Sequence, residues 1–143
     1  MRRAIGCWVL TISILGSSLA WACSCAPPPP PKLALEASSA VFSGKVVAIE
    51  KEGDFEKAVT LEVGDVWKGV EAKKVTVYTA KDGAACGYGF KEGSKYLVYA
   101  TLLKRGEGKA LSTNLCSRTK PLADAKDDLE ALGKPTAAAA EVP

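Results

Sequence analysis

Alternation of apolar and polar side chains is the clearest pattern in the middle of the chain. In several short segments every second residue is apolar, which is the period of a strand with one buried face. We predict five strands over residues 40–50, 58–67, 73–79, 95–103 and 109–115. Gly44 and Gly64 interrupt the alternation of the first two, and we interpret each as a β-bulge. Five such strands predict a small closed or partly closed barrel, a mainly β fold.

Helical spacing flanks the strands on both sides. A helix is predicted from Pro121 to Leu132 with Gly133 as its stop, and its apolar stripe is expected to pack on the barrel. A short helix is predicted over residues 32–39, after a proline run over residues 27–31 that must be extended because each ring fixes φ. Residues 134–143 have little to bury, and we expect a flexible tail there.

The first 22 residues have the pattern of a secretory signal peptide. A basic start precedes an apolar run over residues 5–15, and Ala20 and Ala22 provide small side chains for cleavage before Cys23. This interpretation places one domain, residues 23–133, outside the cytoplasm, either secreted or periplasmic.

Two alternatives would instead tie the chain to a membrane. Residues 4–22 carry no charge and are nearly long enough to form an uncleaved anchor. A cysteine directly after the cut is also where a bacterial lipoprotein carries its lipid, although Ala20 and the bulky Trp21 fit that signal poorly.

Composition excludes several classes of function. The chain has 143 residues and no histidine, so it cannot build a Ser/His or Cys/His nucleophile or a His-ligated zinc site, and we expect neither an enzyme nor a cofactor. Without residues 1–22, 121 residues remain with 17 basic and 16 acidic side chains, a balance unsuited to binding nucleic acid. We expect a monomer. Four strand aromatics are expected in the core rather than in a base-stacking surface, namely Trp67, Tyr78, Tyr96 and Tyr99.

Four cysteines remain after the predicted cleavage, and an oxidising compartment favours two disulfides. Cys23 and Cys25 are separated by one residue and would need a strained ring to pair with each other, so we expect each to reach Cys86 or Cys116. Either assignment would fix the amino terminus to the body at two points. The alternative is a thiol redox or metal-carrying protein that uses Cys23-Ser24-Cys25.

Four sequence blocks resemble, in the same order, those of the tissue inhibitors of metalloproteinases. The blocks are Cys23-Ser24-Cys25-Ala26-Pro27-Pro28, Val66-Trp67-Lys68-Gly69, Val77-Tyr78-Thr79 with Cys86-Gly87-Tyr88, and Thr113-Asn114-Leu115-Cys116. The resemblance covers residues 23–133 and is to the inhibitory amino-terminal domain alone, as in a minimal bacterial-type member without the second domain or the third disulfide. It implies a five-stranded OB-like barrel of the netrin type, with bridges Cys23–Cys86 and Cys25–Cys116.

The resemblance also implies a mechanism and a partner. The free α-amine and carbonyl of Cys23 would chelate the catalytic zinc of a metalloprotease and displace its water, so the partner contributes the metal and the chain has no metal site of its own. Ser24 would point where the first primed side chain of a substrate sits. The implied inhibitory edge consists of Ser24, Cys25, Ala26, Pro27, Ala84, Ala85 and Cys86.

Each of these residues also has a simpler interpretation. The cysteines would stabilise the fold without any inhibitory role, Ser24 would only fit between two bridges, and the prolines would only space the terminus from the barrel. A netrin-like protein-binding module without inhibitory activity is therefore the main alternative.

Overall fold

The computed structural model describes residues 23–138, so the predicted signal peptide and the last five residues lie outside the described part of the chain. The fold is mainly β. Its strands are β1 (Ala40–Glu52), β2 (Glu56–Lys68), β3 (Lys74–Ala80), β4 (Lys95–Arg105), β5 (Gly108–Ser112), β6 (Lys120–Pro121) and β7 (Ala137–Ala138). Its helices are α1 (Pro31–Ala37), the 3₁₀ turns η1 (Gly83–Ala85) and η2 (Leu122–Asp124), and α2 (Lys126–Leu132).

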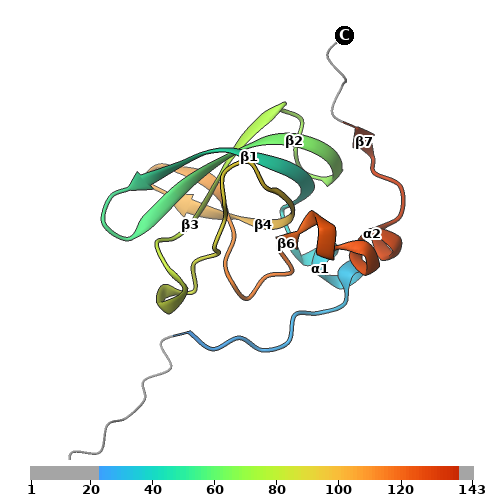
Figure 1. The fold of residues 1–143 in the computed structure, drawn as a ribbon, viewed down its shortest axis with the longest axis horizontal. Helices are drawn as coiled ribbons and strands as arrows, with labels where there is room; N and C mark the ends of the chain where they lie inside the picture. Colours follow the sequence, from blue (N-terminus) through green and yellow to red (C-terminus); the bar gives the residue numbers. More distant parts are fainter. Residues whose placement is uncertain (1–22, 139–143) are drawn as a thin grey trace, which may run out of the picture.

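Five strands close into a ring, which confirms the predicted OB-like barrel (Figure 1). β1 pairs antiparallel with both β2 and β4, β3 pairs with β2, and β5 pairs with β4. A short parallel contact between β3 and β5, Val77 with Leu111 and Tyr78 with Ser112, completes the ring. None of the helices within residues 23–138 has the length and apolar character needed to span a membrane.

The core has two layers because residues 40–44 of β1 and 96–100 of β4 are buried on both faces. Alternate residues such as Phe42 and Val98 fill the barrel interior, whereas Val41 and Leu97 face the helices. The helix-facing layer also contains Trp67 and Tyr99, and Tyr96 lies in the interior layer. The predicted core role of these three aromatics is therefore confirmed, while Tyr78 is half-buried on the barrel surface.

The two predicted bulges have different outcomes. Between the pairs Phe42–Val66 and Gly44–Val63, β2 advances three residues while β1 advances two, so Gly64 and Asp65 together oppose Ser43, a bulge that includes the predicted Gly64. Gly44 is not bulged, and the prediction there is wrong. A Cβ at Gly44 would lie 3.1 Å from the carbonyl oxygen of Glu62, so this glycine allows β1 and β2 to approach closely.

The C-terminal helix packs on the barrel as expected but begins later. Lys120 and Pro121 pair with β4 as β6, and Pro121 has an extended backbone with ψ 137°, so the helix cannot begin there. α2 runs from Lys126 to Leu132, and Gly133, whose φ is +73°, caps its C-terminal end. The predicted apolar stripe lies in the helix-facing layer, through Leu122, Ala125, Leu129 and Leu132.

The first part of the predicted flexible tail is paired instead. The backbone N–H of Thr136 donates to the carbonyl of Val66 at 2.8 Å, and β7 pairs with Asp65 and Val66 of β2. β3 begins at Lys74, so this end of β2 has β1 on one edge and no strand of the barrel on the other, and the tail residues complete the hydrogen bonds of that open edge.

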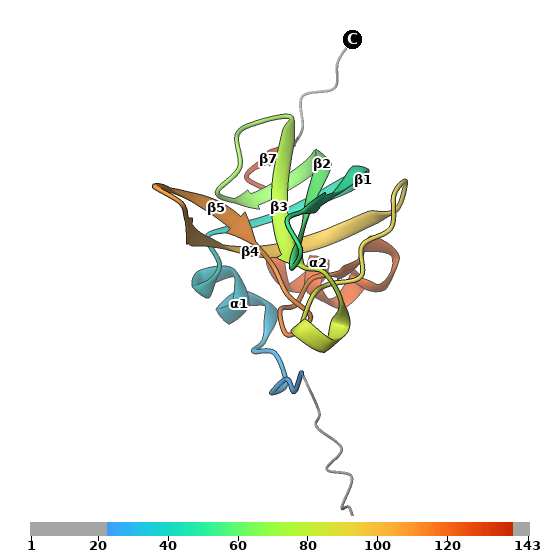
Figure 2. The same ribbon diagram turned by 90° about the vertical axis from the view of Figure 1, so that its left-hand side faces the viewer.

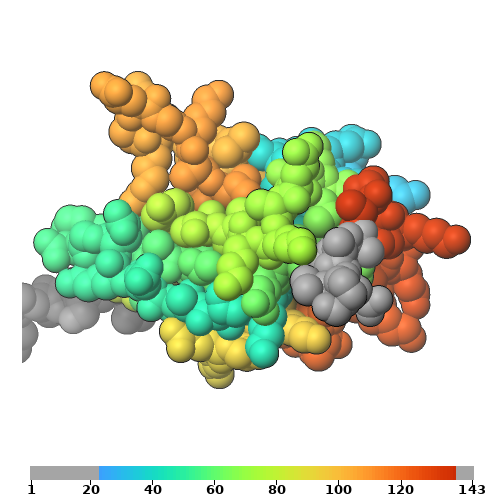
Figure 3. Space-filling view, turned by 90° about the horizontal axis from the view of Figure 1, so that it is seen from above, coloured from blue at the N-terminus to red at the C-terminus, as the bar shows by residue number. Residues whose placement is uncertain are grey.

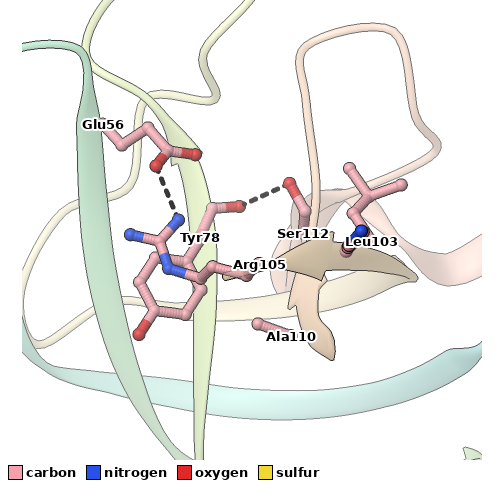
Figure 4. A pocket seen from close by; sticks show the side chains of 7 residues that line it. Glu56, Tyr78, Leu103, Arg105, Ala110 and Ser112 are labelled. Atoms are coloured by element: carbon pink, nitrogen blue, oxygen red, sulfur yellow. Dashed lines mark hydrogen bonds and ion pairs between the residues drawn. The ribbon is translucent and has the colours of Figure 1, made fainter. Parts of the chain in front are cut away.

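The β4–β5 hairpin projects from the body of the molecule (Figure 3), and Arg105, the last residue of β4 before the turn, links the turn end of the hairpin to β2. The Arg105 guanidinium lies 3.8 Å from the centroid of the Tyr78 ring, donates to Glu56 at 2.6 Å, and pairs with Glu52 (Figure 4). The side chains of Arg105, Tyr78 and Glu56 line a cavity of about 80 Å³. At its edge the Ser112 hydroxyl donates a hydrogen bond to the Tyr78 carbonyl. Because the Arg105 guanidinium is already paired with two carboxylates, we interpret the residues around this cavity as structural: they close the barrel between β3 and β5 and do not form a ligand site.

Candidate functional site

An exposed, extended stretch of chain crosses one end of the barrel beside η1 (Figure 2). We call residues 23–30 the N-terminal segment. Cys23 is half-buried, and every residue from Ser24 to Pro30 is exposed. The segment forms no helix or strand because its prolines fix φ and lack a backbone N–H. α1 begins directly after it, with Pro31 at the first helical position, where a missing N–H costs nothing.

Two disulfides fix the segment to the barrel. Cys23 is bonded to Cys86 with a Cα–Cα distance of 5.2 Å, and Cys25 is bonded to Cys116 with 5.1 Å, the same pairs that the resemblance implies. The two bridges lie side by side, because the sulfurs of Cys23, Cys86 and Cys116 all lie within 4.8 Å of one another. Sulfurs bonded in this way are not thiolates, so the oxidised site lacks the thiolate ligands that a metal-carrying protein would need.

The loop around η1 is shaped by Asp82 and Gly87. The Asp82 carboxylate accepts a hydrogen bond from the Ala85 N–H at 3.1 Å, and its carbonyl accepts one from the Gly87 N–H at 2.8 Å. Cys86 has a left-handed φ of 61°, and a Cβ at Gly87 would collide with the carbonyl of Ala80. This tight turn presents Ala85 to solvent and directs Cys86 toward the N-terminal segment.

A second loop, residues 113–119, fixes the other bridge. Its Leu115 N–H donates to the Cys86 carbonyl at 2.8 Å, and the Cys116 N–H donates to the Asn114 side chain at 2.9 Å. The buried Thr113 hydroxyl donates to the carbonyl of Tyr99 at 2.9 Å. Both loops that carry the bridges are thus connected to each other and to β4.

The structure brings all the residues of the implied edge together at this end of the barrel. Cys86 and its bridge to Cys23 join the N-terminal segment to η1, so the two stretches of the edge meet there. The exposed members of the edge are Ser24, Cys25, Ala26, Pro27, Ala84 and Ala85.

Sequence reasoning missed a buried ion cluster next to the segment. Asp128 is fully buried and accepts two hydrogen bonds from the Arg118 guanidinium, at 2.6 and 2.8 Å, and one from Lys120 at 2.7 Å. Burial raises the pKa of Asp128, but the hydrogen bonds from Arg118 and Lys120 outweigh it and hold the pKa below its usual value. The sequence did contain one signal for this cluster: Asp128 lies three residues after Ala125, which places a charged residue on the apolar face of the predicted helix.

Arg118 also contacts the N-terminal segment. Its Nη1 donates to the carbonyl of Pro29 at 3.0 Å, while its other nitrogens hold Asp128. Tyr99 completes the cluster with its hydroxyl 3.4 Å from Asp128, and burial, followed by the negative charge of Asp128, raises the pKa of Tyr99 to about 12. The segment is therefore fixed at Cys23, Cys25 and Pro29.

No protein-family model matches this chain, and no curated protein matches it. A proposal about its function consequently depends on its own residues and their arrangement.

Proposed function

We propose that the chain, once cut before Cys23, is an exported inhibitor of zinc metalloproteases. One observation carries the proposal: residues 24–30 are exposed along their whole length, although two disulfides and a hydrogen bond fix them to the barrel. Terminal residues with so little burial are usually mobile. A terminus that is both fixed and exposed loses little conformational entropy when it enters the cleft of a partner.

The chemistry follows from the first residue. After cleavage, the α-amine and the carbonyl oxygen of Cys23 form a five-membered chelate for the open position of a catalytic zinc. The zinc belongs to the target enzyme, and the chelate displaces the water that this enzyme needs as its nucleophile. An amine with an ordinary pKa of about 8 is partly neutral near pH 7, so binding the metal requires only modest deprotonation.

The neighbouring residues set how the target cleft is filled. Ser24 is exposed and is the first side chain beyond the chelating residue, so it enters the first primed pocket of the target. Ala84 and Ala85 are small and exposed beside the Cys23–Cys86 bridge, and they leave room for the rim of the cleft. A binding module with the same fold has no requirement for a free amine, and this difference separates the two candidate functions.

The test adds one alanine before Cys23. We expect inhibition to weaken by at least about a hundredfold, near 3 kcal/mol, because the extra residue converts the chelating amine into an amide. Disulfides and thermal unfolding should be unchanged, and trimming the alanine with an aminopeptidase should restore inhibition. A larger side chain at Ser24 should instead re-rank a panel of metalloproteases by the depth of their pockets.

Intact mass must first show that the native sample begins at Cys23 with an unmodified amine. An alanine-extended protein that inhibits as well as the native one would refute the chelate mechanism. If such a native sample inhibits no metalloprotease in a broad panel, the netrin-like binding module replaces the proposal.

A further inference from the structure

We infer that Arg118 is a positioning residue for the N-terminal segment. Within residues 23–138, residues 23–29 make a single hydrogen bond with the rest of the chain, and the Arg118 guanidinium donates it to the carbonyl of Pro29. This inference rests on the proposed function, because it concerns the direction in which the segment leads to Cys23.

A proline-rich segment depends on a donor from elsewhere. Pro27, Pro28 and Pro29 have no backbone N–H, so only their carbonyls can hydrogen-bond to the barrel. A guanidinium can reach such a carbonyl while its other nitrogens remain paired with a carboxylate. Arg118 has this arrangement, with Nη1 on Pro29 and with Nε and Nη2 on Asp128.

Asp128 makes the guanidinium a rigid support. The carboxylate is fully buried on α2, and the Arg118 side chain is only 15% exposed, so the bidentate pair is shielded from water and holds one orientation. Lys120 donates to the same carboxylate at 2.7 Å, but the structure shows no hydrogen bond from Lys120 to the N-terminal segment among the described residues. The two cations therefore share the anion and differ in their contact with Pro29.

Two attachments define a line. One loop, residues 113–119, holds the N-terminal segment at two positions, Cys25 through its disulfide to Cys116 and Pro29 through its hydrogen bond from Arg118. These two positions are four residues apart in the sequence. An extended proline segment advances about 3 Å per residue, so these points are separated by about 12 Å of stiff chain. With the Pro29 attachment lost, residues 26–29 can move between Cys25 and α1, and Ala26 and Pro27 of the implied edge move with them, while both bridges still hold Cys23 and Cys25.

The experiment compares Arg118→Gln with the matched variant Lys120→Gln in oxidised protein that begins at Cys23. Carbon-detected NMR relaxation, which observes prolines, measures the order of residues 26–29 without any protease present. Thermal unfolding and inhibition of a responsive metalloprotease complete the comparison. We expect Arg118→Gln to lower the order of residues 26–29 and to weaken inhibition about threefold, while Lys120→Gln lowers thermal stability with segment order and inhibition unchanged.

Three results would overturn the inference. Residues 26–29 could stay as ordered in Arg118→Gln as in the native protein, or both variants could loosen them equally, which would make the effect a general one of the ion cluster. Alternatively, the segment could loosen while inhibition stays the same, so that its direction does not matter for binding. If the native protein inhibits nothing, the proposed function fails by itself, and the NMR comparison still decides whether Arg118 fixes the segment.

Discussion

The two disulfides should contribute equally to stability and unequally to inhibition. Their loops span 63 and 91 residues, but they are linked to each other in the native chain. When Cys23–Cys86 is intact, the shortest path from Cys25 to Cys116 runs through that bridge. The second bridge therefore closes a loop made of only the 2 residues from Cys25 to Cys23 and the 30 from Cys86 to Cys116. The same path is closed when the first bridge is added to the second. In the chain-entropy model a loop of about 32 residues is worth about 3.7 kcal/mol at 25 °C.

Paired replacements avoid stray thiols that would themselves bind zinc. We expect Cys23→Ala/Cys86→Ala and Cys25→Ala/Cys116→Ala each to lower the free energy of unfolding by about 4 kcal/mol. Trp67 is the sole tryptophan after residue 22 and is buried, so its fluorescence reports urea unfolding of each protein.

Inhibition should separate the two variants. The first variant frees the terminal residues ahead of Cys25, and the cost of ordering them on binding should weaken inhibition at least about tenfold. The second keeps Cys23 on Cys86 and Pro29 on Arg118, so inhibition should stay within about threefold of native. Stability losses that differ by more than about 1.5 kcal/mol would refute the linked-loop reasoning. Equal losses of inhibition would refute the special place of the Cys23 bridge.

Two further predictions concern stability. Because the pKa of Asp128 is lower in the folded state than its unfolded value of about 3.9, its contribution is complete above that pH and is lost as pH falls through the folded pKa. Thermal unfolding between pH 6 and pH 2 should show the loss beginning near pH 4, and a ¹³C titration that places the Asp128 pKa at or above 3.9 would contradict it. Gly87→Ala should destabilise the fold by at least about 2 kcal/mol in urea unfolding, since its Cβ would collide with the Ala80 carbonyl, whereas Gly83→Ala at an open position in the same loop should change stability by less than about 1 kcal/mol.

The barrel was predictable because its strands follow local patterns. A period of two identified the strands, and the phase shift at Gly64 located a real bulge. Gly44 gives the same signal in the sequence, yet its cause is a close approach of β2, which only the register between strands reveals. Pro121 likewise suits a helix start by its own preference, and pairing with β4 overrides it.

Half of the candidate site was not accessible to such reasoning. The cysteines, prolines and alanines of the edge are neighbours in the sequence or belong to recognisable blocks. Arg118 and Asp128 are ordinary charged residues by type, and their importance comes from burial beside Pro29, 89 residues away from Arg118 along the chain. The partner of a buried charge depends on tertiary packing, and a sequence pattern does not encode it.

The distance along the chain between the segment and its attachments determines the order in which the protein can be assembled. As the chain is synthesised from its N-terminus, Cys23 and Cys25 emerge before their partners, because Cys86, Cys116 and Arg118 follow Cys23 only 63, 93 and 95 residues later. The two early cysteines have no favourable partner in each other, because a single residue separates them. The first residues made are therefore the last to be fixed, and a chain that stops before α2 lacks the buried anion that holds Arg118 in place. An ordered N-terminal segment is thus a mark of a completed molecule.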